Sequence, residues 1–268
     1  MRIGTHEFDV KNQTYIMGIM NVTPDSFSDG GKIKSVDAAL KRAEQMQREG
    51  AAILDIGGES TRPGYTPVSE EEEMERILPV IEAVKKNIDI PISVDTYKST
   101  VAKAAIFAGA DLINDIWGLK ADAQMAEVIA KNDVACCLMH NRETSIYENF
   151  VEDVLTDLKY SLALAAQAGI PSDKIMLDPG VGFAKSYEQN LEILRNLDKI
   201  QTLGYPILLG TSRKSVIGLT LNLPSEERLE GTLVTTVTAV QQKCGFVRVH
   251  DIKENYRAIQ MAQAIYRR

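Results

Sequence analysis

Short apolar runs recur along the chain, and a stretch with helical spacing of apolar positions follows each of them. Each run has the length of a buried strand, and several are rich in β-branched residues. The eight runs are YIMGIM, AAILDIG, PISVD, ADLINDI, VACCLM, KIMLD, PILLG and FVRVH. Because the runs are apolar at successive positions, they predict strands that are buried on both faces, as in a parallel sheet.

The stretches between the runs predict helices with recognisable ends. SVDAALKRAEQMQREG offers Ser35 as the N-cap and Gly50 as the C-cap. SEEEMERILPVIEAVKKN begins with a serine cap and an acidic first turn, and Pro79 is expected to kink it. Further helices are predicted in KSTVAKAAIFAG, ADAQMAEVIAKN, ENFVEDVLTDLKYSLALAAQAG, YEQNLEILRNLDKI, EGTLVTTVTAVQQKCG and KENYRAIQMAQAIYRR.

Eight strands that alternate with helices predict an α/β fold, a (β/α)8 TIM barrel. Parallel neighbours need a helical crossover, and eight repeats within 268 residues suit this barrel better than a doubly wound sheet. An open Rossmann-type sheet would place a G-x-G-x-x-G turn after its first strand, but MGIMNVTPD stands there. No linker divides the chain, so we expect a single domain over residues 1–268, with a small hairpin in residues 1–14.

The composition is that of a soluble globular protein, with 44% hydrophobic and 25% charged residues. A net charge of −7 argues against nucleic acid as a partner. No apolar run approaches the roughly 18 residues of a membrane span, so no membrane partner is expected. Cys136, Cys137 and Cys244 lack metal-ligand spacing, and the first two lie in the apolar run VACCLM. We therefore expect buried reduced thiols and a cytoplasmic protein.

Nearly every predicted strand ends in a hydrogen-bonding or charged side chain. A single polar strand end often marks only the approach to solvent, but eight of them together are harder to explain in that way. In a (β/α)8 barrel the carboxyl ends of the strands meet at one rim, where active sites lie. The residues at these ends are Asn21, Asp55, Asp95, Asn114, Asp115, His140, Asp178, Ser212, Arg213, Lys214, Arg248 and His250.

The residue types at this rim predict a ligand with two halves. Asp95, Asn114 and Asp178 are acceptors that suit the N–H edge of a flat heterocycle. TSRKS follows PILLG at a predicted helix N-terminus, an arrangement that favours anions. The cationic side chains are Arg213, Lys214, Arg248 and His250. The pattern indicates a polar ring joined to a phosphate or diphosphate, although a salt bridge would equally explain Arg213 and a helix cap His250.

Two polar loops follow the first two strands. NVTPDSFSDGG (21–31) and GGESTRPG (57–64) are longer than simple connections require, and we expect them to fold over the rim and exclude water. After the sixth strand, DPGVGF (178–183) places Phe183 where an aryl group could pack against it.

The motifs NVTPDSFSDGG, GGESTRPG, SVDT, IND, LMHN, LDPGVGFAK, TSRKS and RVHD resemble, in this order, the motif set of the dihydropteroate synthase family. The similarity covers the chain from about Ile16 to its end. The resemblance implies a Mg²⁺-dependent, homodimeric transferase of folate biosynthesis and a sulfonamide target. Such an enzyme condenses 6-hydroxymethyl-7,8-dihydropterin diphosphate with p-aminobenzoate to give 7,8-dihydropteroate and diphosphate.

The resemblance also implies a role for each matched residue. The pterin ring would be held by Asp95, Asn114, Asp178 and Lys214, with Ile116 and Met139 against its faces. The diphosphate would be bound by Asn21, Thr61, Arg248 and His250, with Asn21 also on Mg²⁺. The p-aminobenzoate pocket would contain Phe27, Thr61, Pro63, Phe183, Lys214 and Ser215. Asp29 and Arg62 would support the reaction from the two loops.

Two other functions stay open at this point. A methyltetrahydrofolate-binding corrinoid methyltransferase module would share the pterin-reading barrel, but it has no need for the diphosphate contacts of SRKS and RVHD. A non-catalytic pterin-binding protein would keep the barrel without a need for both loops. For the synthase we expect no Ser–His pair or reactive cysteine to act as a nucleophile, because diphosphate can leave once its developing charge is stabilised.

Overall fold

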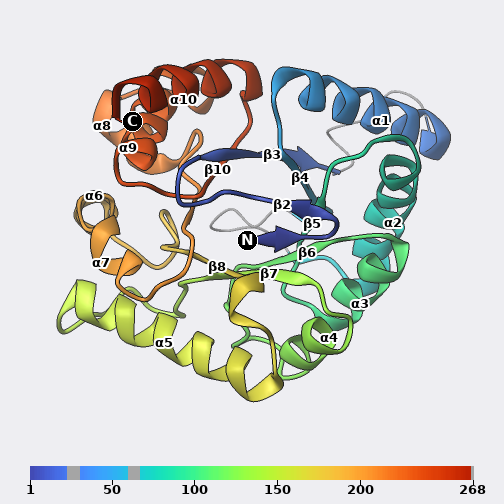
Figure 1. Ribbon diagram of the computed structural model, residues 1–268, viewed down its shortest axis with the longest axis horizontal. Coiled ribbons are helices and arrows are strands. Elements are labelled where there is room, and N and C mark those ends of the chain that lie inside the picture. Colours follow the sequence, from blue (N-terminus) through green and yellow to red (C-terminus); the bar gives the residue numbers. More distant parts are fainter. Residues whose placement is uncertain (23–30, 60–66, 267–268) are drawn as a thin grey trace.

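Eight parallel strands form one sheet in the computed structural model, which describes residues 1–22, 31–59 and 67–266. A parallel bridge between Leu177 and Ile207 joins the two outer strands of this sheet, so that it closes into a barrel (Figure 1). The order around it is β8-β7-β6-β5-β4-β3-β10-β9. The strands are β3 (Tyr15–Asn21), β4 (Ile53–Gly57), β5 (Ile92–Asp95), β6 (Leu112–Asp115), β7 (Ala135–Met139), β8 (Ile175–Asp178), β9 (Leu208–Leu209) and β10 (Phe246–Val249). The predicted (β/α)8 barrel is confirmed, and each predicted run carries one strand.

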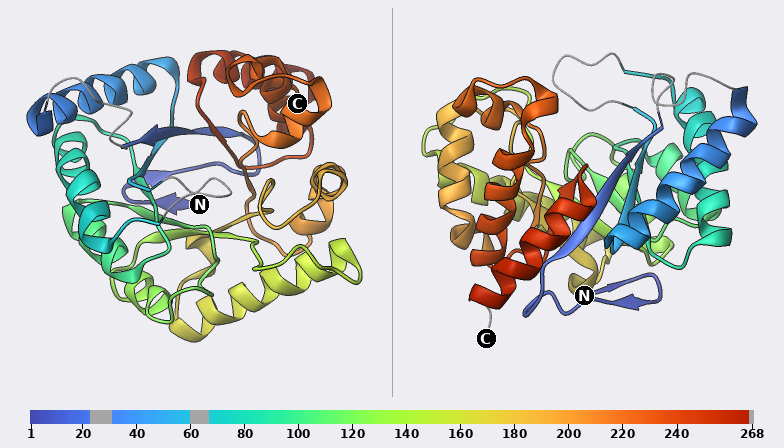
Figure 2. Two further views of the ribbon diagram at one scale, coloured as in Figure 1. Left: turned by 180° about the vertical axis from the view of Figure 1, so that it is seen from behind. Right: turned by 90° about the horizontal axis from the view of Figure 1, so that it is seen from above.

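Helices surround the sheet on its outer face (Figures 1 and 2). They are α1 (Gly31–Glu49), α2 (Glu70–Asn87), α3 (Ser99–Ala108), α4 (Met125–Lys131), α5 (Phe150–Ala168), α6 (Tyr187–Arg195), α7 (Leu197–Gln201), α8 (Ser215–Leu221), α9 (Leu229–Gln241) and α10 (Ile252–Tyr266). Their apolar sides share one buried cluster with the outward-facing residues of the strands. Burial of this cluster is what stabilises the outer layer of the barrel.

The helix ends follow the sequence signals in most places. Ser69 caps α2 by accepting the N–H of Glu72, as expected for that serine. The prediction of a cap at Ser35 is wrong, because α1 already begins at Gly31. The helix expected in YEQNLEILRNLDKI is divided into α6 and α7 at Asn196, whose side-chain amide donates to the carbonyl of Glu192. Asparagine competes with the helix for backbone groups in this way.

A small antiparallel hairpin lies at the end of the barrel where the strands begin (Figure 2, right). It consists of β1 (Arg2–Ile3) and β2 (His6–Glu7), within the segment predicted to form a hairpin. Ile3 and Phe8 are buried in a second apolar cluster with interior residues of the strands. The ring of Phe8 lies 5.5 Å from that of Phe246, in an edge-on contact. The hairpin therefore closes this end of the barrel, and ligands have access from the opposite end.

The prediction of buried, reduced cysteines is confirmed, since Cys136, Cys137 and Cys244 are buried and form no disulfide. Burial raises the pKa of the Cys136 and Cys137 thiols, which makes them poor nucleophiles. Within residues 1–22, 31–59 and 67–266, no helix is both long enough and apolar enough to cross a membrane.

Candidate active site

A cavity of about 470 Å³ lies at the carboxyl ends of the barrel strands. It combines strand-end residues from β3, β5, β7, β8 and β10 with residues from the loops that follow β8 and β9. Its lining residues are Ile19, Asn21, Glu59, Asp95, Ile116, Met139, Asp178, Gly182, Phe183, Gly210, Ser212, Arg213, Lys214, Ser215, Ser225, Arg228, Arg248 and His250. Many of the polar strand-end residues therefore line one cavity at this rim.

Two carboxylates, from β5 and β8, form the acidic wall of the cavity. Asp95 and Asp178 are each only 4% exposed. Asp178 accepts the backbone N–H of Gly180 at 2.7 Å, whereas the Oδ1 atom of Asp95 has no hydrogen-bond partner among the residues that the structure describes. Burial raises the pKa of both groups, that of Asp95 to about 7. A buried acceptor without a partner beside an open cavity is suited to an N–H donor of a ligand.

The side chain of Arg248 points toward Asp95 in this acidic wall and does not lie on the opposite side of the cavity. Its Nε donates to Asp55 at 2.5 Å and its Nη2 to Asp95 at 2.7 Å. Asp55 is fully buried and also accepts the Ser93 hydroxyl at 2.5 Å. Burial opposes the charge of Arg248, but the two carboxylates outweigh this effect and raise its pKa. The expected separation into an acidic and a cationic half is thus wrong for Arg248.

Asn114 contacts Asp55 and does not line the cavity as predicted. Its side-chain amide donates to Asp55 at 3.3 Å, and the residue is not part of the cavity lining. Ile116 and Met139 do line the cavity, and both are almost fully buried. The site therefore has apolar walls close to the acidic wall, with Asn114 as a neighbour of the buried Asp55.

Lys214 supplies the remaining cation at the acidic wall. Its Nζ donates to the carbonyl of Val181 at 2.5 Å and lies 4.8 Å from the centre of the Phe183 ring. Burial lowers the pKa of Lys214 to about 8, while Asp178 partly offsets this effect. Ser215 follows as the first residue of α8 and also lines the cavity.

The other predicted cations have protein partners. Arg213 forms an ion pair with Asp251, with one contact at 2.5 Å and the other at 3.0 Å, so the ordinary salt bridge explains it. The Nδ1 atom of His250 lies 3.0 Å from the Ser212 hydroxyl, which also accepts the backbone N–H of His250. A Ser–His pair is therefore present in the cavity. Because the Ser212 hydroxyl accepts the backbone N–H of His250, it is well placed to orient the His250 ring.

Five predicted residues lie outside the part of the chain that the structure describes. They are Phe27 and Asp29 in the first loop and Thr61, Arg62 and Pro63 in the second. Their roles stay predictions.

Several lining residues had no role in the sequence prediction. Glu59 accepts the amine of Lys98 at 2.7 Å and the N–H of Val68 at 2.9 Å. Arg228 reaches the site from the segment before α9 and donates to the carbonyl of Arg213 at 2.9 Å. Glu59 belongs to the GGESTRPG motif and could have been named from it. Nothing in the local sequence of Arg228 signals its position, because packing of the segment before α9 beside α8 brings it there.

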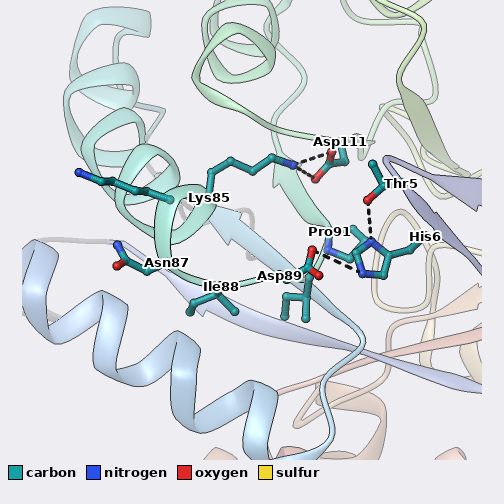
Figure 3. A pocket seen from close by; sticks show the side chains of 10 residues that line it. Thr5, His6, Lys85, Asn87, Ile88, Asp89, Pro91 and Asp111 are labelled. Atoms are coloured by element: carbon teal, nitrogen blue, oxygen red, sulfur yellow. Dashed lines mark hydrogen bonds and ion pairs between the residues drawn. The ribbon is translucent and has the colours of Figure 1, made fainter.

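A second cavity of about 230 Å³ lies near the N-terminal hairpin, between the end of α2 and the start of β5 (Figure 3). Lys85 and Asp111 form an ion pair there at 2.8 Å, and the Nε2 atom of His6 lies 3.9 Å from Asp89. The charged groups of this cavity are thus largely satisfied by one another. It lies near the end of the barrel where the strands begin, and active sites of this fold lie at the other end.

The chain matches the family model for pterin binding enzymes over residues 17–250. A dihydropteroate synthase of Clostridium beijerinckii is 59% identical, over the full length of both chains. The chain belongs to the pterin binding enzymes and, among them, to the dihydropteroate synthases. This family assignment supports a transferase of folate biosynthesis over the corrinoid methyltransferase module and the non-catalytic pterin-binding protein.

Two solved structures share this architecture closely. A dihydropteroate synthase from Clostridium difficile, crystallised in the presence of pteroic acid, is 50% identical, with a TM-score of 0.95 and coverage of 98% of this chain and 100% of that one. The enzyme from Xanthomonas albilineans with 4-aminobenzoic acid is 41% identical, with a TM-score of 0.90 and coverage of 95% and 93%. Identities this high, over nearly the whole chain, support the same activity in this protein.

The buried ion pairs of Asp55 lead to a prediction on stability. Asp55→Ala removes the acceptor of Ser93 and Asn114 and leaves Arg248 with one partner in place of two. We expect the free energy of unfolding to fall by about 3 kcal/mol, as when one member of a buried ion pair is deleted. Urea denaturation measures this change. Asp89→Ala is the control, because the Asp89 side chain is 95% exposed; equal urea midpoints for the two variants would contradict the prediction.

Proposed function

We propose that the cavity holds the pterin ring of 6-hydroxymethyl-7,8-dihydropterin diphosphate at Asp95 and Asp178, and transfers its methylene carbon to the amine of p-aminobenzoate. The products are 7,8-dihydropteroate and diphosphate. The observation that carries the proposal is the pair of buried carboxylates, one with an oxygen left without a partner in the described structure. Such a pair matches a flat ring whose edge presents several N–H donors.

The ring would lie between the apolar and acidic walls. Ile116 and Met139 would contact its faces, and Lys214 would donate to an acceptor on its edge. Asn114 would support the site indirectly, through the hydrogen bond that it donates to Asp55. Because Arg248 now occupies one oxygen of Asp95, ring donors would compete with it there. The Nε atom of Arg248 would keep its contact with Asp55, and the Nη2 atom, released from Asp95, would donate to the diphosphate.

The diphosphate would be bound by Asn21, Arg248 and His250, with Thr61 as a further predicted contact. Asn21 ends β3 and is exposed at the cavity. In phosphate sites Mg²⁺ takes one or two protein oxygens and completes its shell with phosphate oxygens and water. No group of three or more His, Cys, Asp or Glu in residues 1–22, 31–59 and 67–266 could hold a metal. Asn21 with the substrate's own phosphates therefore fits Mg²⁺, which would stabilise charge on the leaving diphosphate.

The second substrate would occupy the part of the cavity lined by Phe183, Lys214 and Ser215. The aryl ring would pack against Phe183, and its carboxylate would accept the Ser215 hydroxyl. Phe27, Thr61 and Pro63 would complete this pocket, with Asp29 and Arg62 as supporting residues of the same loops.

The reaction itself needs little covalent chemistry from the protein. The bond between the pterin methylene carbon and the diphosphate oxygen breaks, and diphosphate keeps the electron pair. The amine nitrogen forms the new bond to the methylene carbon and loses a proton to water. Arg248 and His250 would stabilise the departing anion, while Asp95 and Asp178 would stabilise positive charge on the pterin. Holding the two reactants in line supplies much of the remaining acceleration.

Turnover of both substrates with release of diphosphate tests this function directly, and Asp178→Asn tests its pterin anchor. The variant keeps one oxygen for the Gly180 N–H but places an amide where the ring needs an acceptor. We expect pterin binding, measured by calorimetry, to weaken by about 2–4 kcal/mol. Asp198→Asn, a change at an exposed residue of α7, should bind as the parent does. Binding by Asp178→Asn within twofold of the parent would remove Asp178 from this role.

Asn21→Ala tests the metal and diphosphate part of the site. We expect it to weaken the Mg²⁺-dependent binding of inorganic diphosphate by about tenfold or more, because a metal ligand is lost. Binding of a pterin without the diphosphate should change little. Calorimetry with and without Mg²⁺ measures both, with Asn12→Ala in the N-terminal segment as the control. A variant that binds Mg²⁺ and diphosphate as the parent does would exclude Asn21 as the ligand.

We also propose that two copies of the chain form a homodimer through the outer faces of α8, α9 and α10. Exposed apolar side chains lie on these neighbouring helices, namely Leu219, Val234, Met261 and Ile265. A second copy would bury them, and exposed apolar side chains grouped in this way often mark an interface.

Val234→Glu tests this interface, because Val234 is 67% exposed on α9 and a charge there would be buried by the partner. We expect the parent to have the mass of a dimer by light scattering and Val234→Glu that of a monomer. Phe107→Glu, at an exposed residue of α3, should stay dimeric. A monomeric parent, or a dimeric Val234→Glu, would contradict the proposed surface.

A cytoplasmic location is proposed because the three buried cysteines form no disulfide, which suits a reducing compartment. Fractionation of cells tests it, and recovery of the protein outside the cytoplasm would contradict it.

A further inference from the structure

A chain of hydrogen bonds connects α5 with the loop between β8 and α6. Asp157 on α5 accepts from His140 Nε2 at 3.0 Å. On the other side of the same ring, His140 Nδ1 lies 2.8 Å from the Nζ of Lys185. His140 is only 1% exposed, and neither it nor Lys185 lines the cavity. This chain of hydrogen bonds therefore reaches the loop between β8 and α6 from outside the cavity.

The partners of His140 decide its protonation. The Asp157 carboxylate requires a hydrogen on Nε2, and the Lys185 ammonium requires a lone pair on Nδ1. Burial and, to a smaller extent, the neighbouring Lys185 outweigh the opposing effect of Asp157 and lower the pKa of His140 to about 4. The ring is therefore neutral near pH 7, with its acceptor nitrogen directed at Lys185.

Burial lowers the pKa of Lys185 to about 7, and Asp178 partly offsets this effect. In its charged form the Lys185 ammonium has three hydrogens, and three acceptors surround it. Besides His140 Nδ1, it donates to the carbonyls of Gly180 at 2.9 Å and Phe183 at 3.0 Å. These two carbonyls stand at either end of the short segment that carries Val181, Gly182 and the ring of Phe183. The backbone N–H of Phe183 also donates to the carbonyl of Gly180 at 3.1 Å, so the segment is a closed turn and Lys185 binds both of its ends.

The backbone of the segment depends on close approach to β7. Gly180 has a φ of +69°, and a Cβ atom there would lie 2.0 Å from the carbonyl oxygen of His140. No other residue type fits this position without displacing the loop. The loop is thus packed directly on the residue that orients Lys185.

A second arm from Asp157 reaches the same loop. The carboxylate also accepts the Nε of Arg142 at 2.5 Å, and the Arg142 guanidinium lies 4.5 Å from the centre of the Tyr147 ring. The Tyr147 hydroxyl donates to the carbonyl of Ala184 at 2.8 Å. Asp157 is therefore linked to the loop through Lys185 and Tyr147, which do not line the cavity. These two side chains donate to the carbonyls of Gly180, Phe183 and Ala184.

We propose that Lys185, oriented by neutral His140, is a positioning residue for the second substrate: it fixes segment 180–183 so that Phe183 faces the aryl amine. This inference rests on the proposed function, in which Phe183 lines the p-aminobenzoate pocket. Asp178 belongs to β8, whose backbone is held by the sheet. The pterin end of the site should therefore be much less sensitive to Lys185 than the aryl end.

Lys185→Met keeps the aliphatic stem and removes all three donors. We expect the KM for p-aminobenzoate to rise at least tenfold, kcat to change less than threefold, and calorimetric binding of a pterin to stay within twofold of the parent. Lys85→Met is the matched control, because it removes another hydrogen-bonded ammonium, that of Lys85 on the Asp111 carboxylate, at the other cavity (Figure 3). It should leave all three quantities unchanged, and thermal unfolding confirms that each variant is folded.

Two changes at His140 separate positioning from general stability. Asn places an oxygen near the site of Nδ1 and can accept from Lys185, whereas Ala cannot. We expect His140→Asn to keep the KM for p-aminobenzoate within threefold of the parent, and His140→Ala to raise it as Lys185→Met does. Equal KM values for the Asn and Ala variants would overturn the role of His140 as the acceptor.

The outcomes distinguish this inference from the function on which it rests. An unchanged KM in Lys185→Met, or an equal loss of pterin and p-aminobenzoate affinity, overturns the role of Lys185. Phe183→Ala with an unchanged KM for p-aminobenzoate overturns the placement of the aryl pocket itself. A raised KM in both Phe183→Ala and Lys185→Met, with pterin binding retained, supports both.

Discussion

At the mouth of the barrel the guanidinium of Arg248 lies between the buried carboxylates of Asp55 and Asp95, and the arrangement of the site depends on these contacts. Arg248 on β10 donates to Asp55 on β4 and to Asp95 on β5. Any one of these charges would be costly to bury alone, but together they neutralise much of one another. Asp55 also accepts from Ser93 and from Asn114 on β6. Four strands therefore meet in one polar cluster, which requires the closed barrel.

The same cluster explains how a pocket with buried charges can stay ready for a ligand. Asp95 uses one oxygen for Arg248 and has the other without a partner in the described structure. A ligand N–H that donates to Asp95 Oδ1 would give this buried oxygen a hydrogen-bond partner. Because Asp55 keeps a second contact with Arg248, the guanidinium can exchange Asp95 for an anion without becoming unpaired. In the proposed function, binding of the ring and binding of the anion would thereby be coupled through Arg248.

The two ends of the barrel divide stability and chemistry between them. At the end where the strands begin, Ile3, Phe8 and Phe246 fill the interior with apolar side chains. At the other end, the interior positions carry carboxylates, a guanidinium and an amine. The loop after β8 is held there both by apolar packing of the buried Val181 and by hydrogen bonds from Lys185. This separation lets polar residues accumulate at the mouth while the apolar core stabilises the fold.

The sequence by itself determined the barrel, because period and length of apolar runs report burial directly, and each of the eight runs became a strand. It also determined that Asp95, Asp178 and Lys214 meet at one rim, since parallel strands bring their carboxyl ends together. It could not show that Arg248 donates to Asp55, that Asn114 also donates to Asp55, or that Arg213 forms an ion pair with Asp251. Nor did it give a role to Arg228 or Lys185. These are choices among partners tens or hundreds of residues apart, and only the closed barrel brings those partners within hydrogen-bond distance.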